Sequence, residues 1–267
     1  MDHQALETLL CSRDPVQLSQ TITDLCRAKV HAAVPALLKL LAFPDPAVRA
    51  NAAYALGELG THDVQTVAPA LLSLLADPDS LVRSEAVDAL GSLRYTPAVD
   101  PLIGMLQRDE DPVARASAAE VLGELGQPRA LPVVSQALHD PDESVRAFAA
   151  NSIGLLGTPE LLPFLQTQLD SEEIPRVKAE LLIARYRLGE EAGFQRLFDL
   201  LGNADESLAT AILNSLEDLA TRQTPSTISS HGAQMREALV ALGQRLPMLR
   251  SHARRIIGLF IDPTRSL

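Results

Sequence analysis

Small and apolar residues recur along this chain in a helical pattern that returns at a nearly constant interval. The stretch Asp45–Gly60 reads DPAVRANAAYALGELG, with Val, Ala and Leu at the spacing of one face of an α-helix. Related stretches follow at Asp77–Arg94, Asp109–Gly126 and Asp140–Gly157. The arginine that the copies share recurs at intervals of 34, 32 and 31 residues, at Arg49, Arg83, Arg115 and Arg146. A fixed period of this length predicts an α-solenoid, in which each repeat packs only on its neighbours.

Each repeat is expected to hold two antiparallel helices, which we call A and B. The A helix is marked by an apolar pattern that starts at a proline, and the prolines are Pro35, Pro69, Pro101, Pro132 and Pro163. Proline in the first turn of a helix costs no hydrogen bond, because the N–H groups there have no partner within the helix. The whole chain therefore predicts an all-α fold of about seven helix pairs with a closing pair, without strands.

The B helix has a start signal and a stop signal in most copies. An aspartate before the helix is expected to cap the free N–H groups of its first turn. A glycine at the end is expected to supply the left-handed residue that stops the helix, at Gly60, Gly126, Gly157 and Gly189. The aspartate and the shared arginine are four residues apart, which predicts ion pairs within each helix: Asp45 with Arg49, Asp79 with Arg83, Asp111 with Arg115 and Asp142 with Arg146. Because these pairs recur in every copy, we interpret them as a structural ladder.

The repeat pattern weakens toward both ends of the chain, as terminal repeats that face water do. The expected organisation is a degenerate N-terminal capping repeat at 1–29 and a regular array at 30–189. The array is followed by a degenerate repeat at 190–222, an exposed loop at 223–232 and a C-terminal helical cap at 233–262.

These repeats resemble the HEAT-like repeats of the phycobilisome-lyase type, over about Asp14 to Gly189. The resemblance implies a right-handed superhelix whose B helices line the concave side. Proteins of this type attach, isomerise or detach bilins on phycobiliprotein cysteines, often as two-subunit complexes. The resemblance therefore implies a bilin lyase or a chaperone-like subunit as one function, with bilin as the cofactor. The chain is also similar in size to the cyanobacterial HEAT-repeat protein that interacts with the A-type iron–sulfur scaffold, which implies an iron–sulfur assembly partner as another.

The charge of the chain argues against a nucleic-acid partner. The net charge is −11, and phosphate contacts need clustered Lys and Arg. From His231 onward, six arginines face only two carboxylates, which makes that end +4 and leaves −15 on the rest. Two cysteines do not make a disulfide framework, and the sequence shows neither a secretory signal nor an apolar run long enough to span a membrane. A cytoplasmic location is expected.

The residue types that carry chemistry do not form a recognisable reaction centre. None of the histidines is followed by the glutamate that di-iron hydroxylases of this architecture use: His3, His31, His62, His139, His231 and His252. Cys26 replaces the small glycine found in other B helices, so we interpret it, with Cys11, as a packing residue. No phosphate loop or catalytic triad is present in the sequence. We therefore expect no catalytic, cofactor-binding or metal site.

The remaining candidate is a binding surface for another protein. Positions two, five and nine residues after the repeat arginine are expected to face outward on the concave side. The partner-binding residues predicted in this way are Asn51, Tyr54, Glu58, Glu85, Asp88, Glu120, Glu124, Phe148, Asn151, Leu155, Ile183 and Arg187. The face is acidic up to Glu124 and apolar from Phe148 onward, which is typical of a partner site. The alternative is that Phe148, Leu155 and Ile183 are buried between repeats. The sequence predicts a protein-binding scaffold or adaptor without catalysis.

Overall fold

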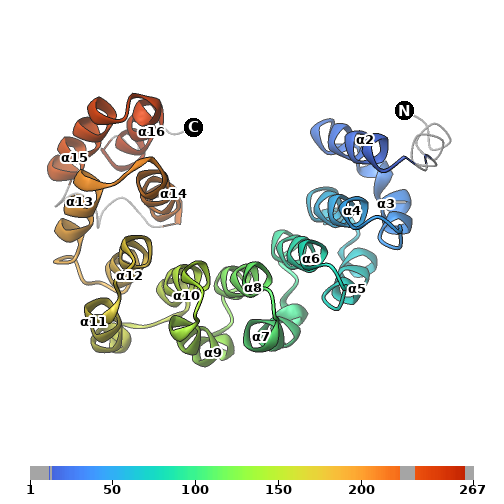
Figure 1. Ribbon diagram of the computed structural model, residues 1–267, viewed down its shortest axis with the longest axis horizontal. Helices are drawn as coiled ribbons and strands as arrows, with labels where there is room; N and C mark the ends of the chain where they lie inside the picture. Colours follow the sequence, from blue (N-terminus) through green and yellow to red (C-terminus); the bar gives the residue numbers. More distant parts are fainter. Residues whose placement is uncertain (1–11, 13, 223–231, 262–267) are drawn as a thin grey trace. The chain divides into compact units, whose positions relative to one another are not determined.

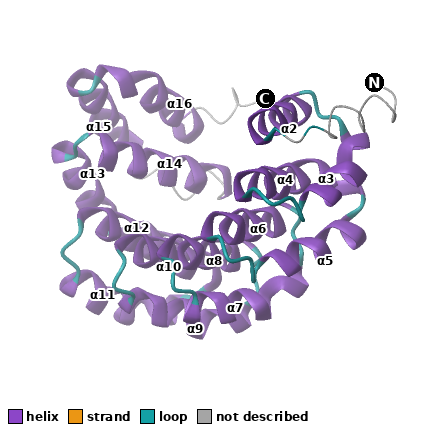
Figure 2. Cartoon of the chain, turned by 45° about the vertical axis from the view of Figure 1, so that its right-hand side comes forward, coloured by secondary structure: helices purple, strands orange, loops and turns teal. Residues whose placement is uncertain are grey.

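The computed structural model describes residues 12, 14–222 and 232–261, with the side chain of Ile261 omitted. All regular elements within these ranges are helices (Figure 2), as expected for an α-solenoid. None of the described helices is both long enough and apolar enough to cross a membrane. The predicted loop at 223–232 falls on residues outside these ranges except for Gly232, as do His3, Cys11 and His231.

The helices alternate between the two kinds that the sequence predicts. The B helices are α2 (Pro15–Arg27), α4 (Pro46–Leu59), α6 (Ser80–Ser92), α8 (Pro112–Glu124), α10 (Glu143–Leu156), α12 (Pro175–Arg187), α14 (Glu206–Arg222) and α16 (Arg250–Ile261). The A helices are α3 (Val34–Leu40), α5 (Val64–Leu74), α7 (Val99–Arg108), α9 (Leu131–Gln136), α11 (Leu162–Ser171), α13 (Phe194–Asn203) and α15 (Gly232–Arg245). Short 3-10 turns flank most A helices, at His31–Ala33, Gly60–His62, Thr96–Ala98, Pro128–Ala130, Ala137–His139, Pro159–Leu161 and Pro247–Leu249.

The chain divides into two compact units, Met1–Ser152 and Ile153–Leu267. In the first unit, α4, α6 and α8 lie side by side in one layer, and α5 and α7 form part of a second layer (Figure 1). In the second unit, α12, α14 and α16 pack in sequence, and α13 packs on α15. The core of the first unit is made largely of the Ala, Val and Leu residues of the repeat, as Ala53, Leu56 and Val87 illustrate. In the second unit, side chains such as Ile183 and Phe194 join the core.

The aspartates before the B helices cap them as the sequence predicts. The carboxylate of Asp45 accepts hydrogen bonds from the N–H groups of Ala47 at 2.9 Å and Val48 at 3.2 Å. Asp79, Asp111 and Asp142 accept from the first turns of α6, α8 and α10 in the same way. These caps satisfy N–H groups that would otherwise lack a partner, and they fix the start of each helix.

The predicted ion pairs within the B helices are wrong for Arg49, Arg83 and Arg115, because each of these arginines reaches the next repeat instead. Arg49 donates through Nε and Nη2 to both carboxylate oxygens of Asp77, at 2.8 Å each. Arg83 binds Asp109 and Arg115 binds Asp140 with the same two-pronged geometry. The caps already occupy the aspartates four residues before the arginines. The ladder is therefore structural, as expected, but it joins neighbouring repeats.

Each rung of this ladder also holds the loop between two helices. The third guanidinium nitrogen of Arg83 donates to the carbonyl oxygens of Asp77 at 2.9 Å and Pro78 at 3.3 Å. Asp109 accepts a further hydrogen bond from the N–H of Asp111, at 3.0 Å. The two side chains of this pair are only 9% and 8% exposed. Because burying charges is unfavourable, the pair depends on all of these hydrogen bonds.

Two of the glycines expected to end B helices do not adopt the left-handed conformation. Gly126 and Gly189 do, with φ of +67° and +98°. Gly60 instead has φ of −82° and begins a 3-10 turn, and a Cβ there would lie 3.1 Å from the side chain of Val67. At Gly157 a Cβ would lie 2.6 Å from the carbonyl oxygen of Ile153. In these two copies glycine is required for close packing, not for its backbone freedom.

The A helices depart from the prediction at one proline. Pro35, Pro132 and Pro163 occupy the first turns of their helices, as expected. Pro69 lies inside α5, because that helix begins earlier, at Val64. A preceding apolar residue, Val67, is fully buried, so packing extends the helix beyond the proline signal.

Candidate functional site

Three neighbouring B helices of the first unit carry most of the predicted partner-binding residues. Tyr54 of α4 is 52% exposed. Aromatic residues make up only 3% of this protein, so an exposed one stands out. The surrounding carboxylates of Glu58, Asp88 and Glu120 are exposed as well. The half-buried members are Asn51, Glu85 and Glu124. We call the surface formed by these seven residues the B-helix face.

The helices that carry this face approach one another closely. A Cβ on Gly57 of α4 would lie 2.8 Å from Cα of Ala89 in α6. A Cβ on Gly91 of α6 would lie 2.9 Å from Cγ2 of Val121 in α8. The first approach is to backbone and the second is to a side chain, and both leave no room for a side chain at the glycine. They place the axes at the short end of the usual range, about 8 Å apart. The acidic side chains of α4, α6 and α8 therefore form one continuous patch.

The carboxylates of the B-helix face influence one another. Burial, with the charge of Asp88, raises the pKa of Glu85. Burial raises the pKa of Asp88, and so does the charge of Glu124, while a hydrogen bond with Ser117 acts in the opposite direction. Both shifts mean that the folded protein disfavours these negative charges. A cation placed on the face would relieve that cost.

A groove of about 250 Å³ opens where the B-helix face meets α2. Asn51, Tyr54 and Glu58 form its α4 wall, and Cys26 and Arg27 are among the residues of its α2 wall. Burial and the charge of Glu58 raise the pKa of the Cys26 thiol. The thiol therefore stays protonated at neutral pH, which makes it a poor nucleophile.

The predicted face does not continue into the second unit. Phe148 and Asn151 at the end of the first unit, and Leu155 at the start of the second, are half-buried on α10. Ile183 of α12 is 0% exposed, so the expectation that it faces outward is wrong and the alternative of burial between repeats holds for it. Arg187 is also turned inward, where it forms an ion pair with Asp218 of α14.

The packing of α14 explains this change. Glu180, two residues after the repeat position of α12, accepts a hydrogen bond from Ser215 of α14. Together with the pair between Arg187 and Asp218, this contact turns the predicted outward face of α12 toward α14. The sequence rule for outward positions holds in α4, α6 and α8 and fails in α12.

The sequence rule also missed exposed apolar side chains at the start of three B helices. Val16, Leu81 and Val113 occupy equivalent positions in α2, α6 and α8, and each is exposed. Their recurrence two residues before the repeat arginine position was the signal available in the sequence. Because they lie in the first turns, they border the loop edge of the B-helix layer.

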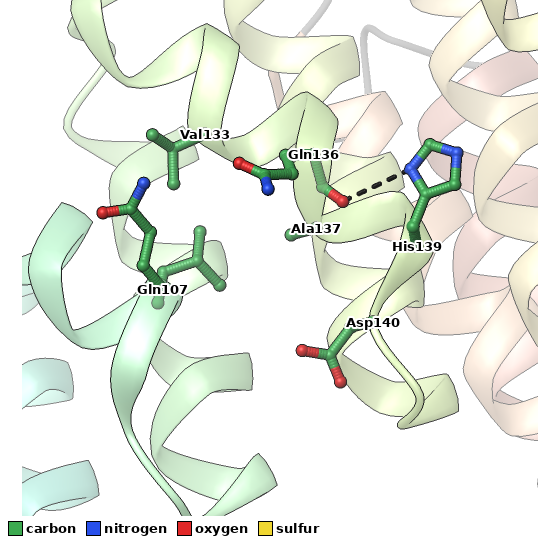
Figure 3. Close-up of a pocket in the computed structure, with 7 residues that line it drawn as sticks. Gln107, Val133, Gln136, Ala137, His139 and Asp140 are labelled. Atoms are coloured by element: carbon green, nitrogen blue, oxygen red, sulfur yellow. Dashed lines mark hydrogen bonds between the residues drawn. The ribbon is translucent and has the colours of Figure 1, made fainter.

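A second hollow, of about 280 Å³, lies between α7 and α9 in the other helix layer. Gln107 of α7 and Val133 and Gln136 of α9 are among its lining residues (Figure 3). His139 contacts the carbonyl oxygen of Gln136 at 3.4 Å, and Asp140 is held by Arg115. Asp140, the carboxylate that lines this hollow, is thus already engaged in the ladder.

The histidines within the described ranges do not gather with other metal-ligating residues. No group of three or more His, Cys, Asp or Glu side chains suited to a metal ion occurs in that part of the chain. The rings of His31 and His62 meet edge to face at 5.1 Å, and His31 contacts the carbonyl oxygen of Leu59. His252 contacts Glu217 at 3.0 Å, which Arg255 also binds. These contacts join secondary structure elements.

Comparison with known proteins agrees with this architecture. A family model described as HEAT repeats matches residues 4–68, 68–141, 99–184 and 131–217. One chain of the complex of CpcE and CpcF of phycocyanin lyase from Nostoc sp. PCC7120 is similar over 97% of this chain and 94% of its own, with 23% identity and a TM-score of 0.59. The protein YibA of Escherichia coli is similar over 100% and 93%, with 18% identity and a TM-score of 0.53. At these identities the similarities show the fold alone. No curated protein sequence matches significantly.

Proposed function

This chain belongs to the HEAT-repeat family, and from that premise we propose that it is a scaffold that binds a partner protein on its B-helix face. The observation that carries the proposal is the acidic patch across α4, α6 and α8, in which Glu58, Asp88 and Glu120 are exposed. The raised pKa of Glu85 and of Asp88 supports it. Proteins retain unfavourable charges of this kind mainly where function requires them. Phe148 and Asn151 of α10 extend the proposed site.

The chemistry of the face fits recognition better than catalysis. Exposed carboxylates attract a basic partner and speed its association, while an aromatic side chain such as Tyr54 supplies contact energy after docking. The proposed partner is therefore a protein with a basic surface.

Charge reversal tests this function. Asp88→Lys with Glu120→Lys should reduce the association rate for the native partner about tenfold or more at low salt, because two attractive charges become repulsive. The matched control is Asp100→Lys with Glu110→Lys, which changes the net charge equally but alters α7 and the following loop. Surface plasmon resonance at several salt concentrations measures both. An equal reduction of the association rate in the two variants would mean that the net charge matters and the B-helix face does not.

A second candidate function is favoured by one similarity. The chain resembles in fold a chain of the phycocyanin lyase complex over nearly its full length. The corresponding proposal is that this protein takes part in bilin attachment or removal, as a lyase subunit or a chaperone-like subunit. Mixing the purified protein with a bilin tests it. A shift of the visible absorbance would support this candidate, and an unchanged spectrum would favour the scaffold.

A further inference from the structure

The final described helix pair, α15 and α16 (Figure 1), holds a groove of about 310 Å³. Much of its lining is aliphatic, with Val240 on α15 and Ala253 and Ile257 on α16. Val240 is 46% exposed, although it is a large apolar side chain. The two helices approach closely beside the groove, because a Cβ on Gly243 would lie only 3.3 Å from Cα of Arg250. A ligand that covered this apolar surface would therefore gain free energy by removing it from water.

The groove lies on the side of α16 that is turned away from α14. His252 and Arg255 of α16 contact Glu217 of α14. Since successive residues of an α-helix are about 100° apart, Arg254 and Ile257 point to roughly the opposite side. In the first unit, the side of α4 that is turned away from α2 packs against α6. The groove thus occupies a side on which a B helix elsewhere in this chain receives another helix.

Two arginines one helical turn apart border the apolar surface. Arg250 and Arg254 both line the groove, and both are exposed. Arg250 donates through Nε to the carbonyl oxygen of Gly243 at 3.1 Å, which fixes its guanidinium at the groove. Within residues 14–222 and 232–261, neither arginine forms an ion pair with a carboxylate. Like charges four residues apart on a helix repel each other, so anionic groups bound beside them would relieve that repulsion.

The combination of these two features selects the kind of ligand. An amphipathic helix enters an apolar groove through side chains at positions i, i+3 or i+4, and i+7. Carboxylates four residues apart on such a helix are separated by about 6 Å along its axis, as Arg250 and Arg254 are along α16. A small anion would satisfy the arginines but leave Val240 and Ile257 in water. An acidic amphipathic helix satisfies both.

We propose that the groove between α15 and α16 binds an acidic amphipathic helix of a partner protein. Aliphatic side chains of that helix lie against Val240 and Ile257, and its carboxylates pair with Arg250 and Arg254. This docking site goes beyond the proposed function, because it is separate from the B-helix face and takes a ligand of opposite charge. The side of α16 that contacts α14 still caps the packed helices of the second unit.

Three helical peptides test the site on the full chain. The first is a fluorescein-labelled peptide of about 18 residues with leucines along one face and a glutamate after each leucine. The second has the same composition, but its leucines are spread around the helix. The third has lysines in place of the glutamates. Fluorescence anisotropy at low salt should show that the first peptide binds about tenfold or more tightly than the other two.

Substitutions in the groove separate a specific site from general charge attraction. Arg254→Glu should weaken the first peptide about tenfold, because an attractive charge becomes repulsive. The matched control is Arg196→Glu on α13, an exposed arginine outside the groove, which should change the affinity less than about twofold. Val240→Ala keeps every charge and should weaken the peptide about threefold to tenfold through lost apolar contact. Circular dichroism confirms that each variant is folded.

Several results would overturn the inference. They are equal affinities for the three peptides, no binding of the first peptide below about 1 mM, and equal weakening by Arg254→Glu and Arg196→Glu. Tighter binding of decanoate than of the first peptide would assign the groove to a small amphiphile. A dimer seen by sedimentation and abolished by Arg254→Glu would assign it to a second copy of this chain, and either result would also overturn the inference.

The B-helix face is tested separately from this groove. Asp88→Lys with Glu120→Lys should leave the affinity for the first peptide within about twofold of the wild type, because those residues lie on α6 and α8. A loss of peptide binding in that variant would contradict a site confined to α15 and α16. Failure of the peptide test would leave the proposed function of the B-helix face standing.

Discussion

At the scale of single residues, the repeat arginine has the most demanding role. Its guanidinium joins its own loop to the first aspartate of the next repeat, as Arg115 does with the carbonyl oxygens of Asp109 and Glu110 and the carboxylate of Asp140. Planar geometry with several N–H groups suits arginine to this task, and lysine could not make the same contacts. Neighbouring repeats are therefore held in register by a charged group that is almost fully removed from water.

The first prediction concerns one rung of this ladder. Arg83→Ala leaves the carboxylate of Asp109 buried without its cation, so we expect the free energy of unfolding to fall by about 3 to 5 kcal/mol. The control is Arg27→Ala, whose pair with Asp24 is largely exposed and should contribute less than about 1 kcal/mol. Urea denaturation followed by circular dichroism measures both. Similar losses in the two variants would contradict the ladder.

The ladder also predicts how stability depends on pH. Burial tends to raise the pKa of Asp77, Asp109 and Asp140, but hydrogen bonds from the arginines and from backbone N–H groups outweigh it and hold each pKa below its usual value. A lowered pKa in the folded state stabilises the protein above the unfolded value of about 3.9, and that contribution is lost as the pH falls through the folded value. The difference in melting temperature between the wild type and Asp109→Asn should therefore be large at pH 7 and shrink below about pH 4. A difference that stays constant between pH 7 and pH 2 would show that charge is not the cause.

The carboxylates of the acidic face are predicted to have the opposite effect on stability. Because the pKa of Glu85 and that of Asp88 are raised, the folded state disfavours their charged forms at pH 7. Glu85→Gln with Asp88→Asn should therefore raise the melting temperature while it weakens binding of the partner. Differential scanning calorimetry gives the first quantity and surface plasmon resonance the second. A lower melting temperature would show that these charges stabilise the fold and are not kept for binding.

At the scale of elements, the B helices pack through small residues at fixed positions. A Cβ on Gly123 of α8 would lie 2.8 Å from Cα of Ser152 in α10, a distance too short for any ordinary contact. Ser152 is fully buried, and its hydroxyl donates to the carbonyl oxygen of Ala119 in α8 at 2.8 Å. The helices are therefore close because the residue between them has no side chain.

A pair of glycine substitutions tests this packing. Gly123→Ala should destabilise the protein by about 1 to 3 kcal/mol, because the added methyl group forces α8 and α10 apart. Gly258→Ala in α16 meets no atom within 4 Å and should stabilise it by about 0.5 to 1 kcal/mol through improved helix propensity. Denaturation midpoints measure both changes. Equal effects of the two substitutions would mean that the close approach has no energetic weight.

The same scale shows what could be read from the sequence. Aspartate before the helix and an apolar period predicted the B helices and their caps, because both signals are local. The partner of each arginine was not predictable in this way, since Arg49 and Asp77 meet only after two repeats have packed. The exposure of Tyr54 followed from helix periodicity, whereas the burial of Ile183 depends on how α14 lies against α12. Local signals gave the elements, and packing decided which of their faces stay open.

At the scale of the whole molecule, the two units differ in what they offer. The first unit presents the acidic B-helix face with Tyr54 at one end. In the second unit the corresponding positions of α12 are engaged with α14, as Glu180 and Arg187 show. The final helix pair carries a groove lined in part by Arg250 and Arg254, so the basic residues lie far along the chain from the acidic face. We therefore propose that the first unit binds the partner and that the last helix pair acts as a cap.

Site-specific photo-crosslinking in the native host tests the central claim most directly. A benzoylphenylalanine placed at Tyr54 lies on the B-helix face, one placed at the exposed Ser92 lies at the end of α6, and one placed at Gln65 lies on α5 in the other helix layer. We predict that the first two positions crosslink to the same partner protein through a basic segment, identified by mass spectrometry, and that Gln65 gives no such product. Crosslinks to a common partner from Gln65, with none from Tyr54 or Ser92, would contradict the assignment of the B-helix face as the binding site.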